Sequence, residues 1–495
     1  MMKKVLSFIE KHEVLLVILC VVALMRLPGL FEPNRYADED IYLTIGQALR
    51  KGLLLYRDVY DNKTPLIYVV AMIAGNVMWF RFILMIWNLI NITVIWGLAK
   101  KLLANKWGVT IATVLFAVFS TLPLLEGEIA NGEIFMIMPV AAALYLVLSK
   151  TGQLVEKGMV YLWSGMLWSV AFLFKSPPLV ELFGLFFFMT IYLSSSWRDL
   201  GKKILDKRLW LLAFGFLIPV LTSVFYFFLR GIGRVYLQSA LLQNFAYISS
   251  GGGGSGKLAL LSGGLTTRAL VMFGGLTLIW FFRRKLGNHF GLISIWAVTA
   301  VFGAFLSGRP YPHYLIEMVG PLALLVGFLL TQPTVFAVGF GVLISLLVAA
   351  GVVRYQFWYY KSLPYYQNFV AYIFGSKSKE QFYKFWGSNV TRDYELATYI
   401  DNVTNKDDKI FVWGTEPAIY AISNRLPATK YTVSYHILDF SAQEEVGRAL
   451  FKDRPPVVVV IKSEKGRFSQ LAGILNDSYV VTGSFGDALV YLRLK

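Results

Sequence analysis

The chain has 495 residues, of which 56% are hydrophobic and 16% are charged. Soluble proteins average about 45–50% apolar and about 25% charged residues, so a fold exposed to water on every side could not hide this much apolar surface. The net charge of +17 does not indicate nucleic-acid binding, because the basic residues form short clusters between apolar runs. A single cysteine, Cys20, excludes both a disulfide framework and a thiol cluster for a metal.

The first apolar run, residues 14–30, follows two lysines in the manner of a signal peptide. It is longer than the ~7–15 residues of a signal-peptide core, and no small-residue cleavage pattern follows it. We therefore predict a retained first membrane helix.

Further apolar runs approach the ~20 residues that a membrane-spanning helix needs. The candidate spans are residues 14–30, 80–99, 108–124, 133–148, 159–174, 178–193, 209–229, 269–282, 290–305, 314–330 and 335–353. The sequence thus predicts a mainly α-helical, polytopic membrane protein of about eleven transmembrane helices.

The charges between these runs alternate in kind. Lys and Arg near helix ends are retained in the cytoplasm, and with a cytoplasmic N-terminus every second loop is basic, at residues 100–106, 150–157, 198–208 and 283–285. The opposite loops carry acids, at residues 38–40, 58–61 and 126–133. This pattern predicts a functional site on the extracytoplasmic side.

Two segments on that side do not count as spans. Residues 56–77 are semi-apolar and are expected to lie at the membrane interface, since a span there would invert every later loop. Residues 234–268 form a long outer loop with a run of glycine and serine at 251–256, which is typical of a flexible connector and leaves a mobile lid as the alternative.

The composition changes near residue 355, where an aromatic stretch suited to the membrane interface leads into ordinary soluble sequence. We predict a transmembrane domain over residues 1–355, with an outer loop at 31–79, and a small extracytoplasmic α/β domain over 356–495. Within the second domain we expect a helix at 393–403 and strands at 409–413, 457–461, 479–481 and 488–492.

The outer loop at 31–79 holds the densest group of reactive side chains. Asp38, Glu39 and Asp40 follow directly after the first span, and Lys63 stands downstream. A carboxylate beside the membrane can act as a general base or bind a divalent cation, and a lysine can stabilise a phosphate leaving group. The alternative is that the acids only solvate the loop.

Three other outer loops add acids and cations, and charges that folding buries are costly unless they are used. These residues are Asn131 and Glu133, then Lys175, then Arg309, His313 and Tyr314. We expect these loops to contribute to one site with the first.

With these motifs the sequence resembles the GT-C superfamily of polyprenyl-phosphate-sugar glycosyltransferases, in particular the protein mannosyltransferases of glycosyltransferase family 39 and the lipid A aminoarabinose transferases. The motifs that carry the likeness are Asp38-Glu39, Tyr42, Gly52-Leu-Leu-Leu-Tyr56-Arg-Asp58 and Lys63-Thr-Pro65-Leu-Ile-Tyr68. Weaker similarities lie at Asn131-Gly-Glu133, Lys175, Gly308-Arg309 and His313-Tyr314.

The resemblance implies an inverting transfer of a hexosyl or pentosyl group from a polyprenyl-phosphate donor to a protein, lipid or glycan acceptor. Asp38 would act as the base with Glu39 assisting, and the donor phosphate would be held by Lys63, Lys175, Arg309, His313 and Tyr314. Asn131 and Glu133 are candidates for the acceptor side, where the aminoarabinose transferases have an aspartate. A divalent metal ion at Asp38 and Glu39 is left open, because members of the superfamily differ in metal use.

Two other classes of protein remain as alternatives. A secondary transporter would place charges near the bilayer midplane and show paired broken helices, whereas these charges fall at helix ends. A membrane scaffold would carry inert charged loops and an outer binding domain. The sequence names neither the sugar, nor the acceptor, nor the choice between a dolichyl and an undecaprenyl carrier.

Overall fold

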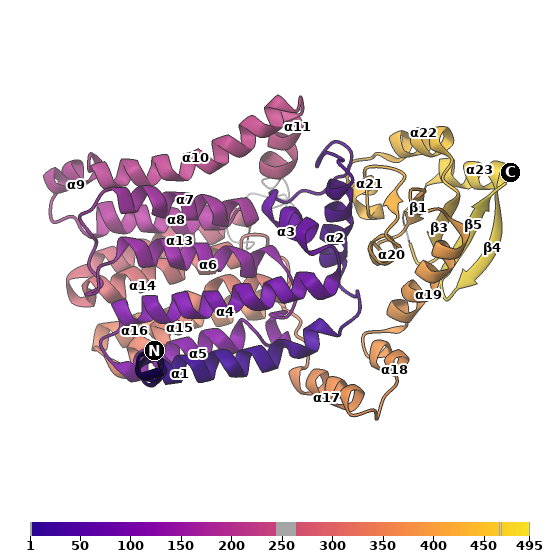
Figure 1. The fold of residues 1–495 in the computed structure, drawn as a ribbon. Helices are drawn as coiled ribbons and strands as arrows, with labels where there is room; N and C mark the ends of the chain where they lie inside the picture. The colour runs from indigo at the N-terminus through magenta and orange to yellow at the C-terminus, as the bar shows by residue number, and fades with distance from the viewer. Residues whose placement is uncertain (1, 244–263, 465, 467, 495) are drawn as a thin grey trace. The chain divides into compact units, whose positions relative to one another are not determined.

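The computed structural model describes residues 2–243, 264–464, 466 and 468–494. The chain divides into two compact units (Figure 1). The first unit contains Met1–Leu27 and Leu84–Ser362, and the second contains Pro28–Ile83 and Leu363–Lys495. The segment predicted as the first outer loop therefore belongs to the same compact unit as the C-terminal domain. The predicted glycine-serine connector at 251–256 lies outside the described residues.

The first unit is built from α-helices that run side by side (Figure 1). Its main helices are α1 (Met2–Arg26), α4 (Val77–Leu102, which begins in the second unit), α5 (Lys106–Phe119), α6 (Gly132–Val147), α7 (Met159–Phe174), α8 (Pro178–Phe187), α9 (Trp197–Ile204), α10 (Lys207–Leu229), α13 (Leu265–Phe281), α14 (Arg283–Ala304), α15 (Ile316–Thr331) and α16 (Val335–Tyr355). Shorter pieces complete it: η2 (Pro123–Leu125), the π-helical turns η3 (Phe188–Tyr192) and η4 (Leu237–Leu242), α11 (Gly233–Tyr236) and η5 (Pro312–Leu315).

Six helical stretches in the described part of the chain are long and apolar enough to cross a membrane. They are His12–Leu30, Val77–Leu102, Lys207–Leu229, Arg283–Ala304, Pro312–Thr331 and Val335–Tyr355. Five further apolar helices are shorter, at Lys106–Phe119, Gly132–Val147, Met159–Phe174, Pro178–Tyr192 and Leu265–Phe281. The chain is an integral membrane protein with a mainly helical fold. The count of eleven spans and the orientation of the termini stay predictions.

Helices α7 and α10 approach closely through glycines. A Cβ added to Gly165 would collide with the carbonyl oxygen of Leu212, and one added to Gly215 would collide with that of Leu162. Small residues let two helix backbones come near each other in a membrane, where packing rather than water exclusion drives helix association. This contact explains why glycines stand inside two otherwise bulky apolar helices.

The second unit combines the segment 28–83 with an α/β domain. Its elements are η1 (Leu27–Leu30), α2 (Ala37–Arg50), α3 (Leu66–Ala74), α17 (Ser362–Ile373), α18 (Lys379–Lys384), α19 (Ser388–Val403), β1 (Lys409–Trp413), α20 (Ala418–Ser423), β2 (Leu426–Pro427), α21 (Ser434–Asp439), α22 (Gln443–Asp453), β3 (Val457–Ile461), α23 (Ser469–Ser478), β4 (Tyr479–Phe485) and β5 (Ala488–Arg493). Helix α3 has nine residues, too few for the ~20 that a span requires. This length agrees with our not counting residues 56–77 as a span.

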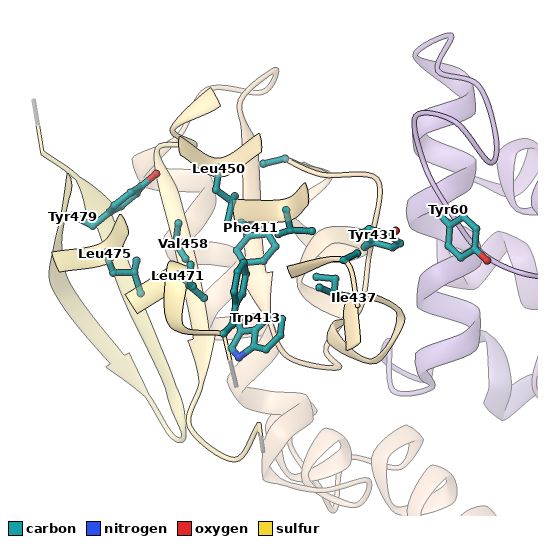
Figure 2. Packing of buried hydrophobic residues seen from close by; sticks show 14 residues of the cluster. Tyr60, Phe411, Trp413, Tyr431, Ile437, Leu450, Val458, Leu471, Leu475 and Tyr479 are labelled. Carbon is teal, nitrogen blue, oxygen red and sulfur yellow. The ribbon is translucent and has the colours of Figure 1, made fainter. Parts of the chain in front are cut away.

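The five strands form one sheet in the order β2-β1-β3-β5-β4. Strands β2, β1 and β3 are parallel to one another, and β5 is antiparallel to both of its neighbours, β3 and β4. Alternate residues of a strand face opposite sides. Phe411 and Trp413 therefore pack with α22 and α23 on one face, as Figure 2 shows, while Ile410 and Val412 pack with α19 and α20 on the other. The sheet is thus the middle layer of an α/β/α arrangement.

The glycine contact between α7 and α10 generates a stability prediction. Replacing Gly215 with Ala places a methyl group against the Leu162 carbonyl, and such overpacking typically costs ~1–3 kcal/mol. Gly274→Ala in α13 is the matched control, because an added Cβ there meets nothing within 4 Å. We expect thermal unfolding in detergent to show a lower midpoint for Gly215→Ala than for wild type, and an unchanged or higher one for the control. Equal midpoints for both variants would contradict the close packing.

Candidate functional site

Asp38 lies in the first turn of α2, where three successive acids face the positive end of the helix dipole. Its side chain is 28% exposed, and Oδ2 lies 3.6 Å from Lys63 Nζ. The Tyr42 hydroxyl, one turn along the helix, donates a hydrogen bond of 3.4 Å to the same oxygen. Asp38 is therefore accessible but already paired with a cation and a phenol.

Lys63 is held from both its backbone and its side chain. Its carbonyl accepts a hydrogen bond from Tyr56 Oη at 2.7 Å, and its amide donates to Tyr68 Oη at 3.3 Å. Its Nζ lies 3.5 Å from Asp61 Oδ2 and 5.1 Å from the ring centroid of Tyr42. The ammonium group thus sits between two carboxylates, Asp38 and Asp61.

Glu39 has a different environment from its neighbour. Its side chain is fully buried and accepts two hydrogen bonds from Arg81, at 3.1 Å from Nε and 2.6 Å from Nη2. The same guanidinium pairs with Glu32 at 3.1 Å, and Glu32 also accepts from Arg35 at 2.7 Å. Glu39 is therefore the inner member of a buried ion-pair network.

Asp40, the third acid, is also buried. It accepts a hydrogen bond from Asn34 Nδ2 at 2.5 Å, but burial raises the pKa of Asp40 well above its usual range. Of the three successive acids, Glu39 and Asp40 are buried, and Asp38 is partly exposed.

Asp61 links Lys63 to the C-terminal domain. Burial opposes its ionisation, but Lys63, His436 and hydrogen bonds from the Asn62 amide and Tyr68 Oη keep the pKa of Asp61 below its ordinary value. The distance from Asp61 Oδ1 to His436 Nε2 is 3.7 Å. Asp61 is therefore a second anion beside Lys63, in addition to Asp38.

A second cluster lies in the first unit, at the ends of α6, α7 and η5. Glu133, in the first turn of α6, pairs with Lys175, the residue that follows α7. His313 contacts Glu126 through Nδ1, and its Nε2 lies 3.5 Å from Glu133 Oε1. Lys175 Nζ lies 4.4 Å from the ring centroid of Tyr314. Five side chains from four segments thus form one network.

Two further predicted residues lie near this cluster in sequence. Asn131, the N-cap residue of α6, is 2% exposed, and neither polar atom of its side chain has a hydrogen-bond partner in the part of the chain that the structure describes. Arg309 follows Gly308, whose φ is 65°, in the turn before η5, and its amide donates to Ser307 Oγ at 3.3 Å.

The structure therefore brings Asp38 together with Lys63, and Glu133 together with Lys175, His313 and Tyr314, each group within its own unit. Sequence reasoning missed Arg81 and His436. Arg81 had a signal, because a charge inside an apolar helix usually has a buried partner. His436 had none, since a lone histidine in a soluble domain is usually part of its core.

A metal at Asp38 and Glu39 does not fit this geometry. Both carboxylate oxygens of Glu39 accept hydrogen bonds from Arg81, and the ammonium group of Lys63 lies beside Asp38, where it would repel a metal cation. Among the described residues, no group of three or more His, Cys, Asp or Glu side chains is arranged to hold a metal ion.

A cavity of about 410 Å³ lies between α13, α14 and α16 in the first unit. Its lining is mostly apolar and includes Met272, Val298 and Phe302. Arg268 and Arg354 also line it, and their guanidinium carbons lie 5.9 Å and 6.0 Å from the ring centroid of Tyr355. The cavity therefore combines an apolar wall with two cations around one aromatic ring.

Comparisons with known proteins give similarity in structure only. No family model matches the sequence, and no curated protein matches it. The crystal structure of ArnT from Cupriavidus metallidurans bound to undecaprenyl phosphate is similar with a TM-score of 0.55 at 15% identity, over 98% of both chains. Its apo form gives 0.53 at 15% identity, over 97% of both chains. An Archaeoglobus fulgidus oligosaccharyltransferase gives 0.44 at 15% identity, over 99% of this chain and 75% of that one. The two ArnT structures show that the chain shares the overall fold of ArnT.

The ion-pair network around Arg81 generates a second stability prediction. Arg81→Met removes the buried cation that Glu39 and Glu32 share and leaves Glu32 with Arg35, and breaking a buried pair in this way costs about 3–5 kcal/mol. Arg57→Met is the matched control, because Arg57 pairs with Asp58 at the surface, with a side chain 54% exposed, and such pairs are worth ~0–1 kcal/mol. We expect the midpoint of thermal unfolding to fall much further for Arg81→Met than for Arg57→Met. A loss for Arg81→Met no larger than that of the control would contradict the network.

Proposed function

We propose that this protein is a membrane glycosyltransferase that takes its sugar from a polyprenyl-phosphate donor on the extracytoplasmic side and transfers it with inversion. The observation that carries the proposal is the position of Lys63 near both Asp38 and Asp61, with Asp38 a partly exposed carboxylate at a helix N-terminus. Such a pair supplies a base for an acceptor and a cation for a phosphate. The ArnT-like fold supports the proposal, and the undecaprenyl phosphate bound in one ArnT structure is of the donor's chemical class.

In the proposed reaction, the acceptor hydroxyl or amine attacks the anomeric carbon from the face opposite the phosphate. The bond from that carbon to the phosphate oxygen breaks, the acceptor's proton passes to Asp38, and the polyprenyl phosphate leaves with the bonding electrons. Lys63 stabilises the negative charge that develops on the leaving phosphate. Inversion follows because attack and departure occur on opposite faces.

In the proposed reaction, Glu39 assists Asp38 indirectly, because its ion pair with Arg81 fixes the first turn of α2. Lys175, His313, Tyr314 and Arg309 contribute to donor-phosphate binding, and Glu133 orients Lys175 and His313. Asn131 and Glu133 remain the candidates for the acceptor side. The acceptor is a protein, lipid or glycan.

The cavity between α13, α14 and α16 suits an anionic lipid. Its apolar wall matches isoprenoid units, and Arg268 and Arg354 offer positive charge around Tyr355. Transferring apolar chain into such a wall is favourable, while the guanidinium groups favour a phosphate. We assign this cavity to the lipid carrier.

The test of the reaction is transfer of radiolabelled sugar from a panel of dolichyl- and undecaprenyl-phosphate donors into membranes that contain the protein. Asp38→Asn removes the base, so we expect transfer to fall at least ~100-fold, within the range for general-base loss. Asp407→Asn is the matched control, because the Asp407 side chain is 99% exposed, and it should transfer at the wild-type rate. Wild-type membranes that transfer no sugar from any donor would favour a transporter or a scaffold.

A second prediction separates Glu133 from Asn131. Glu133→Gln removes the anion that pairs with Lys175 and approaches His313, so we expect transfer to fall at least ~10-fold through a disordered cation site. Asn131→Asp keeps the size of the buried side chain but adds a charge, and a shift in KM for the acceptor alone would place Asn131 on the acceptor side. A Glu133→Gln variant with full activity would remove this cluster from the site.

A further inference from the structure

The segment that carries Lys63 is attached to the C-terminal domain by its backbone. The amide of Tyr60 donates to the Lys430 carbonyl at 2.8 Å, and residues 60 and 431 form a parallel β-bridge. The ring of Tyr60 lies 5.7 Å from that of Tyr431, 5.4 Å from His436 and 5.2 Å from Phe440 (Figure 2 shows Tyr60 facing Tyr431). Residue 60 is therefore fixed only three positions before the lysine.

Helix α2, which carries Asp38, is attached to the same domain. Gln47 Nε2 donates to the Ala421 carbonyl at 2.9 Å, and Thr44 Oγ1 donates to the Pro417 carbonyl at 3.5 Å. Both carbonyls belong to the turn and helix that follow β1. The two members of the Asp38–Lys63 pair thus reach the C-terminal domain by separate contacts.

His436 is a side chain of that domain that approaches Asp61, the second carboxylate beside Lys63. It lies on α21, is 4% exposed, and places Nε2 at 3.7 Å from Asp61 Oδ1. The other oxygen of Asp61 accepts from Tyr68 Oη at 2.8 Å and lies 3.5 Å from Lys63 Nζ. The imidazole therefore approaches one oxygen of Asp61 while the lysine uses the other.

We propose that His436 is a positioning residue for the donor-phosphate lysine, which it orients through Asp61. The imidazole limits the rotation of the Asp61 carboxylate, and the carboxylate holds the ammonium group of Lys63 next to Asp38. This inference rests on the proposed function, because it assumes that Lys63 binds the donor phosphate. According to this inference, the C-terminal domain contributes a positioning residue to the site.

The geometry favours this role over that of an ordinary core histidine. A lysine side chain is a point charge on a flexible four-carbon stem, so it must be held from outside to meet a phosphate in one place. Asp61 Oδ1 accepts a hydrogen bond of 2.8 Å from the Asn62 amide, which restrains the carboxylate at its base. His436 restrains the side of that oxygen facing the C-terminal domain.

The first experiment compares His436→Ala with His436→Gln. Glutamine carries an amide nitrogen at the reach of Nε2, so it should restore the contact with Asp61 that alanine removes. We expect His436→Ala to raise the KM for the polyprenyl-phosphate-sugar donor about tenfold, with a smaller change in kcat, because a binding group is displaced. His436→Gln should stay within about threefold of the wild-type KM.

The matched control is Phe440→Leu. Phe440 packs on Tyr60 and on the His436 ring but has no polar atom for Asp61. If His436 acts only by packing, both variants should lower thermal stability and change the donor KM alike. We expect instead that Phe440→Leu lowers stability while leaving the donor KM at the wild-type value.

A double-mutant cycle with Asp61→Asn tests the route of the effect. Since His436 acts through Asp61, His436→Gln and His436→Ala should add no further rise in KM once Asp61 is Asn. Additive effects, or a wild-type KM in His436→Ala, would overturn the inference. If His436→Ala does not fold, His436→Leu, which fills the space of the imidazole but offers Asp61 no polar atom, takes its place in the cycle and is judged by the same criterion.

Direct binding of the sugar-free polyprenyl phosphate separates this inference from the proposed function. A wild type that binds the lipid but transfers no sugar contradicts the proposed function, and a Kd about tenfold weaker in His436→Ala still supports the role of His436. An equal Kd in both proteins overturns the inference even if transfer is observed. A wild type that neither binds nor transfers overturns both.

Discussion

The structure of the candidate site depends on a guanidinium buried among carboxylates. Arg81 holds Glu39 with two hydrogen bonds and Glu32 with a third, and this network fixes the chain where α2 begins. Burying these charges is favourable only while every partner is present. Glu39 is directed to Arg81, whereas its neighbour Asp38 on the helix is partly exposed and lies beside Lys63. Two adjacent acids thus have different environments, one buried against a guanidinium and one partly open to the surface.

Much of the fold could be read from the sequence because its signals are strong and local. The apolar runs coincide with helices, and the strands at 409–413 and 457–461 were predicted with the bounds that the structure has. Strand β2 was not predicted, because it has two residues and ends in proline. The helices α20 to α22 were also missed, since each is short and their apolar faces are complete only against the sheet.

For the site, sequence reasoning named residues but did not predict which of them pair. Asp38, Lys63, Glu133 and Lys175 were singled out from charge at the ends of apolar helices, whereas the pairs Asp38–Lys63 and Glu133–Lys175 come from the structure. The contacts of Glu39 with Arg81 and of Asp61 with His436 could not, because they join residues 42 and 375 positions apart and depend on tertiary packing. The C-terminal domain looked separable for the same reason: its contacts with residues 28–83 leave no local pattern.

The attachment of Tyr60 and α2 to the C-terminal domain has a consequence for biosynthesis. Thr44 and its partner Pro417 are 373 residues apart, so a ribosome has made most of the chain before this contact can form. Contacts between such distant residues form late, since the entropy of closing the loop must be overcome first. Residues 28–83 therefore reach their place in the second unit only after the membrane helices that follow them have been made. A nascent or prematurely terminated chain would carry this segment without the contacts that the C-terminal domain supplies.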